Sequence, residues 1–409
     1  MTRLTDFSID KQHNCRPNTA TATLYLHIPF CRELCSFCTF NRVQLHDDLG
    51  EAYFDQLSNE LDGYAQMGFE FRTVYIGGGT PTILPKEMDE ILTHLHSLWK
   101  IEEISVETTP ADLTDEVIAI LVRGGVKRLS IGVQSFQDDI LTSLNRRDKY
   151  GSGEKIIECI SDVSGRFETI NIDLIFGLDG QAHSHIDQDL ATAKSLSIDQ
   201  ITYYPLMKPE ARIKPYRAWL VYAINERNLY FHIRNTLQPE FFPSSAWCFS
   251  RQNSMIDEYI ISSSSYAGAG GGAFSYLDDK MVANVFSVSN YIQLLESSRL
   301  PILFQREFSE SEKLRYQMLL NLFGGHPSIK KIISTSSFAM LPLTMFIILL
   351  LILSGTIKKH DGKYRVSKKG AYRALILMKH FFQGISRLRE ACRTIEKPTG
   401  LVDQYSKGE

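Results

Sequence analysis

The stretch YLHIPFCRELCSFC, from Tyr25 to Cys38, decides how the rest of the chain is interpreted. Residues 23–28 are apolar and β-branched, which predicts a strand, and three cysteines at C-x3-C-x2-C spacing follow directly. Thiolates at this spacing can ligate three irons of one cubane iron–sulfur cluster if the chain loops around it. Because the sequence has no fourth cysteine nearby, one iron would stay open to a small ligand, an arrangement suited to catalysis.

A zinc site, or three buried thiols without a metal, is the alternative interpretation. Structural zinc usually takes four protein ligands, with two cysteine pairs in the sequence, and no second pair is present here. The chain has seven cysteines, and those outside the loop are scattered: Cys15, Cys159, Cys248 and Cys392. An odd, scattered set argues against a disulfide framework and for a reducing, cytoplasmic compartment. We therefore expect Cys31, Cys35 and Cys38 to be metal ligands.

Length, composition and charge narrow the class of protein. A chain of 409 residues with 44% hydrophobic residues can bury a sizeable core, and it predicts one large domain with one or two small ones. The net charge of −3 gives no support for a polyanion-binding surface, so we expect no nucleic-acid partner. Residues 1–22 are polar without an apolar segment, which predicts no signal peptide.

Strands and helices are predicted to alternate through the first half of the chain. After the strand over 23–28, strands are expected at 73–76, 103–106, 127–133, 170–176 and 200–205. The helices expected between them cover 47–67, 85–98, 138–144 and 185–196, with one more beginning at Thr114. This alternation predicts an α/β fold with a parallel sheet, and it leaves a curled barrel and a flat doubly wound sheet both open.

The residues that could carry chemistry lie near the ends of these predicted strands. The cysteines follow the first strand, Gly77–Gly79 end the second, and Glu107 ends the third. Gln134 ends the fourth, and Asp173 lies on the fifth. Because sites in parallel α/β folds form at the carboxyl ends of strands, these residues are expected to converge. The glycines can bring bare backbone close to a ligand, although a plain tight turn would explain them too.

Four further motifs follow the cysteine loop along the chain: Gly77-Gly78-Gly79-Thr80-Pro81, Ser105-Val-Glu107, Gly132-Val-Gln134-Ser-Phe136 and Asn171-Ile-Asp173-Leu-Ile-Phe-Gly177. With the cysteine loop, they resemble radical SAM enzymes of the oxygen-independent coproporphyrinogen III oxidase-like family, most densely over residues 25–181. The resemblance implies an incomplete (β/α)6 barrel holding a [4Fe–4S] cluster. It also implies reductive cleavage of S-adenosylmethionine to a 5′-deoxyadenosyl radical. The electron would come from a donor such as flavodoxin or ferredoxin.

The resemblance also implies which residues hold S-adenosylmethionine: Tyr25, Phe37, Gly78, Gly79, Thr80, Glu107, Gln134, Arg146 and Asp173. Arg146 would pair with the ligand's carboxylate, Phe37 would lie near its adenine, and N–H groups of the glycine turn would hold its methionine end. Each polar residue could instead form a structural ion pair, and Phe37 could simply pack. Arg147 follows Arg146, so which arginine faces the site is left open. His27 is interpreted as a strand residue that packs beside the cysteine loop.

The second half of the chain is expected to add a small domain. Residues 338–353 form a 16-residue apolar run, too short to span a membrane. A hairpin turn at Asp361-Gly362 and a helix over 370–388 follow, which predicts a mainly helical, winged-helix-like cap with the run as its core helix. The expected divisions are a tail at 1–22, the barrel at 23–240, an extension completing the core and substrate cavity at 241–305, the cap at 306–395 and a tail at 396–409. No membrane insertion is expected.

The reaction stays open between three interpretations. The resembling oxidases continue their cysteine loop with a fourth cysteine, where this chain has Phe40, and their longer N-terminal segment is short here. A porphyrin-directed enzyme acting on a tetrapyrrole or a similar small molecule is the first interpretation. A methyltransferase-type relative that uses two S-adenosylmethionines is the second, and a non-catalytic haem-binding chaperone, which shares the loop ending in Phe, is the third.

Overall fold

A twelve-stranded sheet forms the centre of the computed structural model, which describes residues 22–207, 216–252 and 265–396. Its middle is parallel, with neighbouring strands paired in the order β11-β1-β4-β5-β6-β7-β8. The bounds of these strands are Tyr266–Ala269 (β11), Ala22–Ile28 (β1), Phe71–Gly78 (β4), Glu103–Thr108 (β5), Arg128–Gln134 (β6), Thr169–Phe176 (β7) and Gln200–Pro205 (β8). The six strands predicted from the sequence are therefore confirmed as consecutive neighbours.

Antiparallel strands extend both ends of this parallel region. On one side lie β12 (Phe274–Leu277), β13 (Lys280–Asn284) and β14 (Ile302–Glu307), and on the other lie β10 (Cys248–Ser250) and β9 (Phe242–Pro243). The end strands β14 and β9 do not pair with each other in the described sheet, so the barrel stays open, as expected. The extension at 241–305 thus supplies both edges. Strand β14 continues through the proposed boundary at residue 305.

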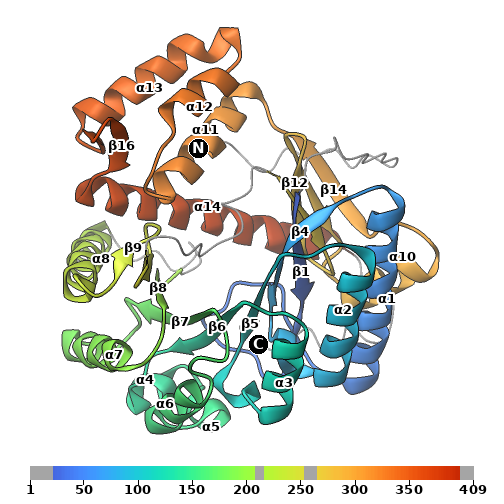
Figure 1. Ribbon diagram of the computed structural model, residues 1–409. Coiled ribbons are helices and arrows are strands. Elements are labelled where there is room, and N and C mark those ends of the chain that lie inside the picture. The colour runs from blue at the N-terminus through green and yellow to red at the C-terminus, as the bar shows by residue number, and fades with distance from the viewer. Residues whose placement is uncertain (1–21, 208–215, 253–264, 397–409) are drawn as a thin grey trace.

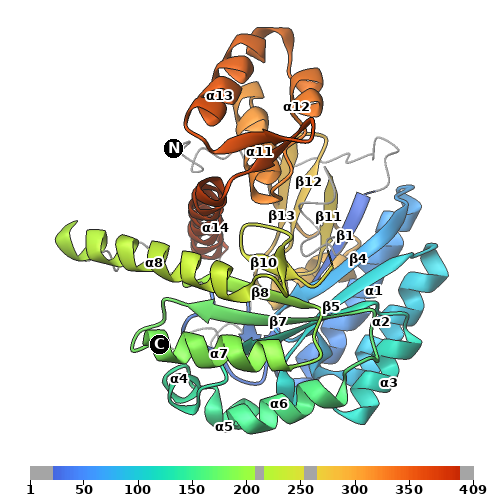
Figure 2. The same ribbon diagram turned by 60° about the vertical axis from the view of Figure 1, so that its left-hand side comes forward.

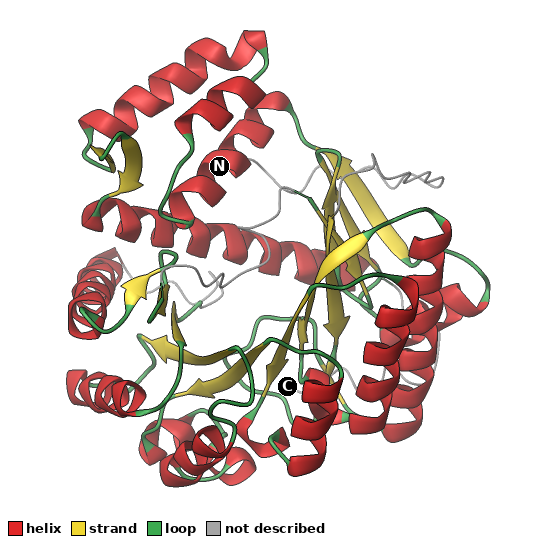
Figure 3. Cartoon of the chain, viewed as in Figure 1, coloured by secondary structure: helices red, strands yellow, loops and turns green. Residues whose placement is uncertain are grey.

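Helices cover the outer face of the curled sheet, as Figures 1 and 3 show. They are α1 (Asp47–Gln66), α2 (Pro85–Leu98), α3 (Asp115–Arg123), α4 (Asp138–Ser143), α5 (Arg147–Tyr150), α6 (Gly153–Asp162), α7 (His183–Ser195) and α8 (Tyr216–Leu237), with short 3-10 turns at η1 (Pro81–Ile83) and η2 (Pro110–Asp112). The predicted start of α3 is confirmed, because the Thr114 hydroxyl accepts a hydrogen bond from the Val117 N–H.

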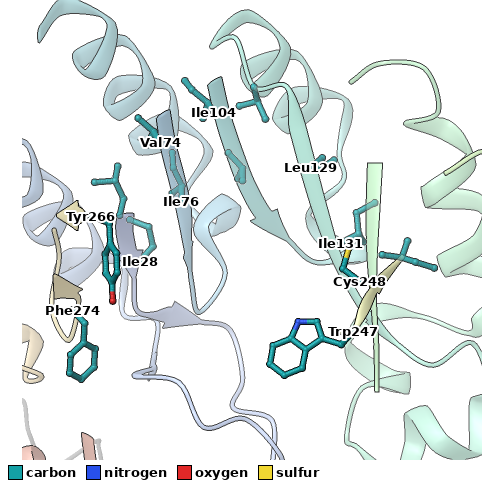
Figure 4. Close-up of a cluster of buried hydrophobic side chains, with 14 of the residues drawn as sticks. Ile28, Val74, Ile76, Ile104, Leu129, Ile131, Trp247, Cys248, Tyr266 and Phe274 are labelled. Atoms are coloured by element: carbon teal, nitrogen blue, oxygen red, sulfur yellow. The ribbon is translucent and has the colours of Figure 1, made fainter. Parts of the chain in front are cut away.

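The two faces of the parallel strands differ in chemistry. Residues facing the helices are apolar and buried, and Figure 4 shows Val74, Ile76, Ile104, Leu129 and Ile131 from three neighbouring strands of this layer. Because side chains alternate along a strand, the residues between them face the barrel interior. Those interior residues are largely polar: Tyr25, Tyr75, Glu107, Ser130, Asn171, Asp173 and Thr202. A parallel sheet is usually apolar on both faces, so this polar inner face is suited to a ligand.

The C-terminal region is mainly helical, as predicted. It contains α10 (Val288–Glu296), α11 (Glu310–Phe323), α12 (Ile329–Thr335), η4 (Phe338–Met340), α13 (Leu341–Leu353), the hairpin β15 (Ile357–His360) and β16 (Lys363–Val366), and α14 (Lys368–Ile395). Asp361 and Gly362 both have positive φ, 47° and 77°, so the predicted hairpin turn is confirmed. The helices α11–α13 with this hairpin form a winged-helix-like unit (Figure 2).

Helix α14 connects this unit to the barrel and contacts the antiparallel region on both sides of the sheet. Near its middle, the Phe382 ring lies 5.9 Å from the Trp247 ring, just before β10. Farther along, the Arg389 guanidinium lies 5.6 Å from the Phe274 ring on β12. A buried ion pair between Lys379 and Glu226 also ties α14 to α8. In Figure 1 α14 accordingly lies between the barrel and the winged-helix-like unit.

Helix α13 is more exposed than the sequence predicted. The apolar run was expected to be buried as the core helix of the cap, yet only Thr344 and Ile348 of α13 are buried. Seven of its thirteen residues are exposed large hydrophobics: Leu343, Met345, Phe346, Leu349, Leu350, Ile352 and Leu353. A uniformly apolar segment has no polar face to indicate which side packs inward.

Among the described helices, none combines the length and the apolar character needed to cross a membrane.

Candidate functional site

The cysteine loop is closed at its base by a short parallel pair, β2 (Phe30–Cys31) and β3 (Val43–Gln44). The Val43 N–H donates to the Pro29 carbonyl at 2.8 Å, and the Leu45 N–H donates to the Cys31 carbonyl at 2.9 Å. Inside the loop, the Arg42 guanidinium donates to the carbonyls of both Cys35 and Cys38. The chain between the cysteines is thus curled around one side chain, which keeps their thiols on a shared turn.

The three thiols fit an iron–sulfur cluster by their chemistry and their neighbours. All are free, and those of Cys31 and Cys35 are buried while Cys38 is partly exposed. Burial raises the pKa of the Cys31 thiol to about 12, so bound iron rather than water would favour its thiolate. No three His, Cys, Asp or Glu side chains in the described ranges are grouped to hold a single metal ion. A cubane does not require this, since each thiolate ligates a different iron.

The glycine turn after β4 packs against the cysteine loop. A Cβ on Gly79 would lie 2.4 Å from the Phe30 carbonyl oxygen, and one on Gly78 would lie 2.7 Å from that of Ile28. The N–H groups of Gly79 and Thr80 donate to those same carbonyls, and the Gly78 N–H donates to Glu107. The expectation that these N–H groups face a ligand is therefore wrong, because the protein already uses them. The Thr80 hydroxyl donates to the Cys31 sulfur at 3.8 Å.

Glu107 lies on the interior face of β5, beside the glycine turn. Its carboxylate accepts hydrogen bonds from the Tyr75 hydroxyl at 2.8 Å and from the Gly78 N–H at 3.1 Å. The pKa of Glu107 is raised to about 7, mainly by burial and in part by the nearby Asp173 carboxylate, while those two hydrogen bonds oppose the shift. Near neutral pH a cationic neighbour would stabilise the ionised form of this carboxyl group.

Asp173 is held by a polar network on β6 and β7. Its carboxylate accepts from the Ser130 hydroxyl at 3.1 Å and from the Asn171 amide at 2.9 Å. The Asn171 amide oxygen in turn accepts from the Thr202 hydroxyl on β8 at 3.0 Å. Burial raises the pKa of Asp173 to about 6, although the positive charge of Arg128 opposes the shift. Two carboxyl groups with raised pKa values therefore share the interior face.

The end of β6 has a strained residue at a predicted ligand position. Gln134 has a φ of 74°, which is uncommon for a residue other than glycine, and the register with β7 shifts between Gly132 and Gln134. Such outliers occur often at functional sites, where the surrounding structure enforces them. The irregularity thus lies at the carboxyl end of the strand, where a ligand site is expected.

The two adjacent arginines are separated by the fold. Arg146 is buried and donates to the Gly132 carbonyl at 2.5 Å, and its guanidinium lies 3.5 Å from the Cys35 sulfur. It also stacks on the Tyr150 ring, 4.0 Å from the centroid. Arg147 instead pairs with Asp138 at 2.9 Å on the outside. Arg146 is therefore the arginine that faces the cysteine loop, which answers the question that the sequence left open.

Tyr25 and His27 connect β1 to the end of the cysteine loop. His27 Nε2 lies 2.7 Å from the Asn41 carbonyl oxygen, which can only accept, so this nitrogen carries the proton. Nδ1 then accepts from the Tyr25 hydroxyl at 2.8 Å. Burial lowers the pKa of His27 to about 4, which keeps the ring neutral. His27 thus packs beside the loop as predicted, and it orients the Tyr25 hydroxyl on the interior face.

The glycine run after β11 serves the core of the protein. A Cβ on Gly270 would lie 2.4 Å from the His27 carbonyl oxygen, and one on Gly272 would lie 2.4 Å from the Asn41 amide. The Gly270 N–H donates to the buried carboxylate of Glu60 at 2.8 Å, which also accepts from the Tyr291 hydroxyl. The contacts of this run therefore fix β1, α1 and α10 together.

Phe37 packs at the edge of a small apolar cluster near the ends of β7 and β8. Its partners there are Ile140, Leu144, Ile175, Leu178 and Leu206. Tyr75 and Asn171 are site residues that we did not predict, and both could have been found from strand alternation beside Glu107 and Asp173. The sequence analysis also missed three arginines that contact the cysteine loop, Arg42, Arg389 and Arg393. No sequence motif or periodicity indicates these contacts.

Comparison with known proteins identifies the superfamily of the chain. Residues 25–193 match the model of the radical SAM superfamily. The heme chaperone HemW of Bacillus subtilis is 30% identical over 73% of this chain and 82% of its own length. The oxygen-independent coproporphyrinogen III oxidase of Bradyrhizobium diazoefficiens is 34% identical, over 40% of this chain and 38% of its own.

The fold has a solved counterpart as well. The structure of coproporphyrinogen III oxidase (HemN) from Escherichia coli superposes with a TM-score of 0.71, covering 90% of this chain and 91% of that one at 20% identity. At this identity the likeness establishes the fold alone. Together with the HemW relative, the matched superfamily model and the cysteine loop, it places the chain in a known group. The chain belongs to the radical SAM superfamily, in the family that contains the oxygen-independent coproporphyrinogen III oxidases and the HemW heme chaperones.

Proposed function

We propose that this chain is a cytoplasmic radical SAM protein that binds haem or a related tetrapyrrole. The observation that carries the proposal is the relative named heme chaperone, which aligns over 82% of its own length and so includes more than the shared barrel. The chain also has Phe40 where the oxidases have a fourth cysteine. The Arg389 guanidinium of α14 lies 5.3 Å from the Phe40 ring, so this end of the loop is packed by the C-terminal region.

Cys31, Cys35 and Cys38 would hold a [4Fe–4S] cluster, and the polar interior face would hold one S-adenosylmethionine. When bound, the cluster supplies the electron for reductive cleavage of S-adenosylmethionine, and a donor such as flavodoxin or ferredoxin would replace that electron. Arg146 beside Cys35 can pair with the ligand's carboxylate, while Glu107 and Asp173 can face its cationic groups. Tyr25, Gln134 and Thr80 line the same region, and Phe37 offers an apolar surface for the adenine.

Catalytic turnover of a tetrapyrrole is the second candidate function. It is supported by the relative named oxygen-independent coproporphyrinogen III oxidase, which is 34% identical over 40% of this chain. Both candidates share the cluster and the S-adenosylmethionine site. They differ in whether a bound tetrapyrrole leaves unchanged.

Product analysis after anaerobic reconstitution separates the candidates. The reconstituted protein is incubated with S-adenosylmethionine and a reductant, with either haem or coproporphyrinogen III, and products are identified by mass spectrometry. A chaperone binds haem about one per chain and returns it intact. Turnover instead gives a modified tetrapyrrole in step with 5′-deoxyadenosine, whereas S-adenosylhomocysteine would indicate a methyltransferase with two S-adenosylmethionines. Failure to bind any tetrapyrrole would contradict the proposed function.

A further inference from the structure

Helix α13 presents an apolar stripe to solvent. Met345, Phe346, Leu349, Leu350 and Leu353 are 62%, 56%, 50%, 47% and 73% exposed. Their spacing of one, three, one and three residues places them along one side of a helix. No other part of the described chain covers this side, and the opposite side packs through Ile348 against α11 and α12. Exposed apolar surface of this extent marks an interaction site.

The position of α13 makes this stripe accessible. Figures 1 and 2 show α13 at the outer end of the molecule, on the far side of α14 from the barrel. Phe338, in the turn that precedes α13, is 91% exposed. The stripe is therefore separate from the cysteine loop and from the interior face of the sheet, and it needs an explanation of its own.

Positively charged side chains flank this stripe on two neighbouring elements. Between residues 324 and 367 the chain has six cations and one acid, Asp361, whereas the whole chain carries −3. The cations are Lys330, Lys331, Lys358, Lys359, Lys363 and Arg365, and all six are exposed. They lie on α12 and on the β15–β16 hairpin, and both α12 and β15 contact α13. An apolar stripe flanked by cations is complementary to an anionic lipid surface.

We propose that α13 docks this protein on the surface of an anionic lipid bilayer. The thirteen residues of α13 span about 20 Å, less than the roughly 30 Å of a bilayer's hydrocarbon core, so the helix would lie along the interface. Its Phe and Leu side chains would enter the acyl boundary while the flanking cations meet the headgroups. A second copy is a poorer occupant, because a symmetric contact would bring two units of charge +5 together.

Vesicle sedimentation with the full-length protein tests the proposal. The probes are vesicles of phosphatidylcholine alone and of equal parts phosphatidylcholine and phosphatidylglycerol. We expect binding to the anionic vesicles to be at least tenfold tighter than to the neutral ones. Lys358→Gln/Lys359→Gln/Lys363→Gln should weaken it about 100-fold, at roughly fivefold per cation. Lys86→Gln/Lys127→Gln/Lys155→Gln, on three exposed lysines of the barrel, is the matched control and should bind like the wild type.

Two variants test the apolar stripe itself. Phe346→Ser/Leu350→Ser should weaken binding to the anionic vesicles at least tenfold with an unchanged melting temperature, because both positions are exposed. Phe346→Trp, which keeps the apolar character, should show a blue shift of its fluorescence when anionic vesicles are added. Binding that ignores lipid charge, a Trp spectrum that does not respond, or a dimer that the Ser variant abolishes would each overturn membrane docking, and the last would assign the stripe to a second copy.

Discussion

At the scale of single residues, the contrast between Arg146 and Arg147 gives the sharpest test of the ligand site. Arg146 is buried beside Cys35, and Arg147 is paired with Asp138 outside. We predict that Arg146→Ala weakens S-adenosylmethionine binding about 10- to 150-fold, the range expected for the loss of a charge-assisted hydrogen bond. Isothermal titration of the reconstituted protein measures the effect, and iron analysis shows whether the cluster is retained.

Arg147→Ala is the matched control, since it removes the same charge one residue away. It should bind S-adenosylmethionine like the wild type. Equal affinities for the two variants would contradict the assignment of Arg146, whichever value they share. If a variant loses its iron, its weaker binding would reflect damage to the cysteine loop and not the loss of a ligand contact.

Glu107 predicts a dependence of stability on pH. Its pKa in the folded protein is about 7, above the ordinary value of 4.5, so the group stabilises the fold fully below pH 4.5 and this contribution is lost as pH rises through 7. Glu107→Gln removes the titration. Between pH 5 and 8 the free energy of unfolding of the cofactor-free wild type should fall by about 1–2 kcal/mol more than that of the variant, because the partly exposed carboxyl is screened. If urea denaturation shows that the free energies of unfolding of the wild type and of Glu107→Gln fall equally with pH, this prediction is ruled out.

Local patterns predicted part of the site and missed the rest for physical reasons. The shared interior face of Glu107 and Asp173 follows from the alternation of side chains along a strand, and the structure places Tyr75 and Asn171 on the same face. The N–H groups of the glycine turn were predicted to face a ligand, but they donate to the carbonyls of Ile28 and Phe30. The sequence alone does not reveal these hydrogen bonds. Hydrogen bonds between distant segments leave no periodic signal.

At the scale of elements, the turn after β4 depends on a missing side chain. A Cβ on Gly79 would lie 2.4 Å from the Phe30 carbonyl oxygen, which belongs to the backbone and cannot move aside without opening the cysteine loop. Gly79→Ala should therefore destabilise the protein by about 2–3 kcal/mol. Gly63→Ala, on α1 with nothing within 4 Å of the new Cβ, should stabilise it by about 0.5–1 kcal/mol. Chemical denaturation of both variants checks the opposite signs.

The end of α14 is predicted to stabilise the cysteine loop. The Arg393 guanidinium donates to the Asn41 side chain at 2.8 Å, and Arg389 donates to the Thr39 carbonyl at 3.3 Å. Losing the half-exposed Arg393 contact should cost about 1 kcal/mol, so Arg393→Ala should speed amide hydrogen exchange in residues 36–41 roughly fivefold. Arg387→Ala, at an exposed position of the same helix, should leave that exchange unchanged. Equal exchange rates would show that α14 does not restrain the loop.

Element boundaries were predicted well wherever periodicity or turn chemistry was strong. The Thr114 cap, the Asp361-Gly362 hairpin and the six parallel strands are all confirmed. Strand β11 was missed because its glycine-containing segment carries little strand signal, and the short antiparallel strands β12–β14 that follow it were not predicted either. The exposed side of α13 was unpredictable, since thirteen consecutive mostly apolar residues give no amphipathic stripe.

At the scale of the whole molecule, one helix contacts both sides of an open sheet. The end strands of the sheet stay unpaired with each other, and α14 contacts the antiparallel region on both sides through Phe382 at Trp247 and Arg389 at Phe274. The same helix contacts the cysteine loop at one end and follows the hairpin beside α13 at the other. The proposed iron site, the barrel and the proposed membrane-docking unit are thus joined by one continuous element.

The electron paramagnetic resonance spectrum of the reduced, reconstituted protein tests the central claim most directly. We predict about four irons per chain on Cys31, Cys35 and Cys38, with one iron open to S-adenosylmethionine, so adding this ligand should change the spectrum. Cys35→Ala should lose the cluster signal, and Cys159→Ala, on the outer helix α6, should keep both the signal and its response. A four-iron cluster whose spectrum ignores S-adenosylmethionine, or one that survives Cys35→Ala, would contradict the account.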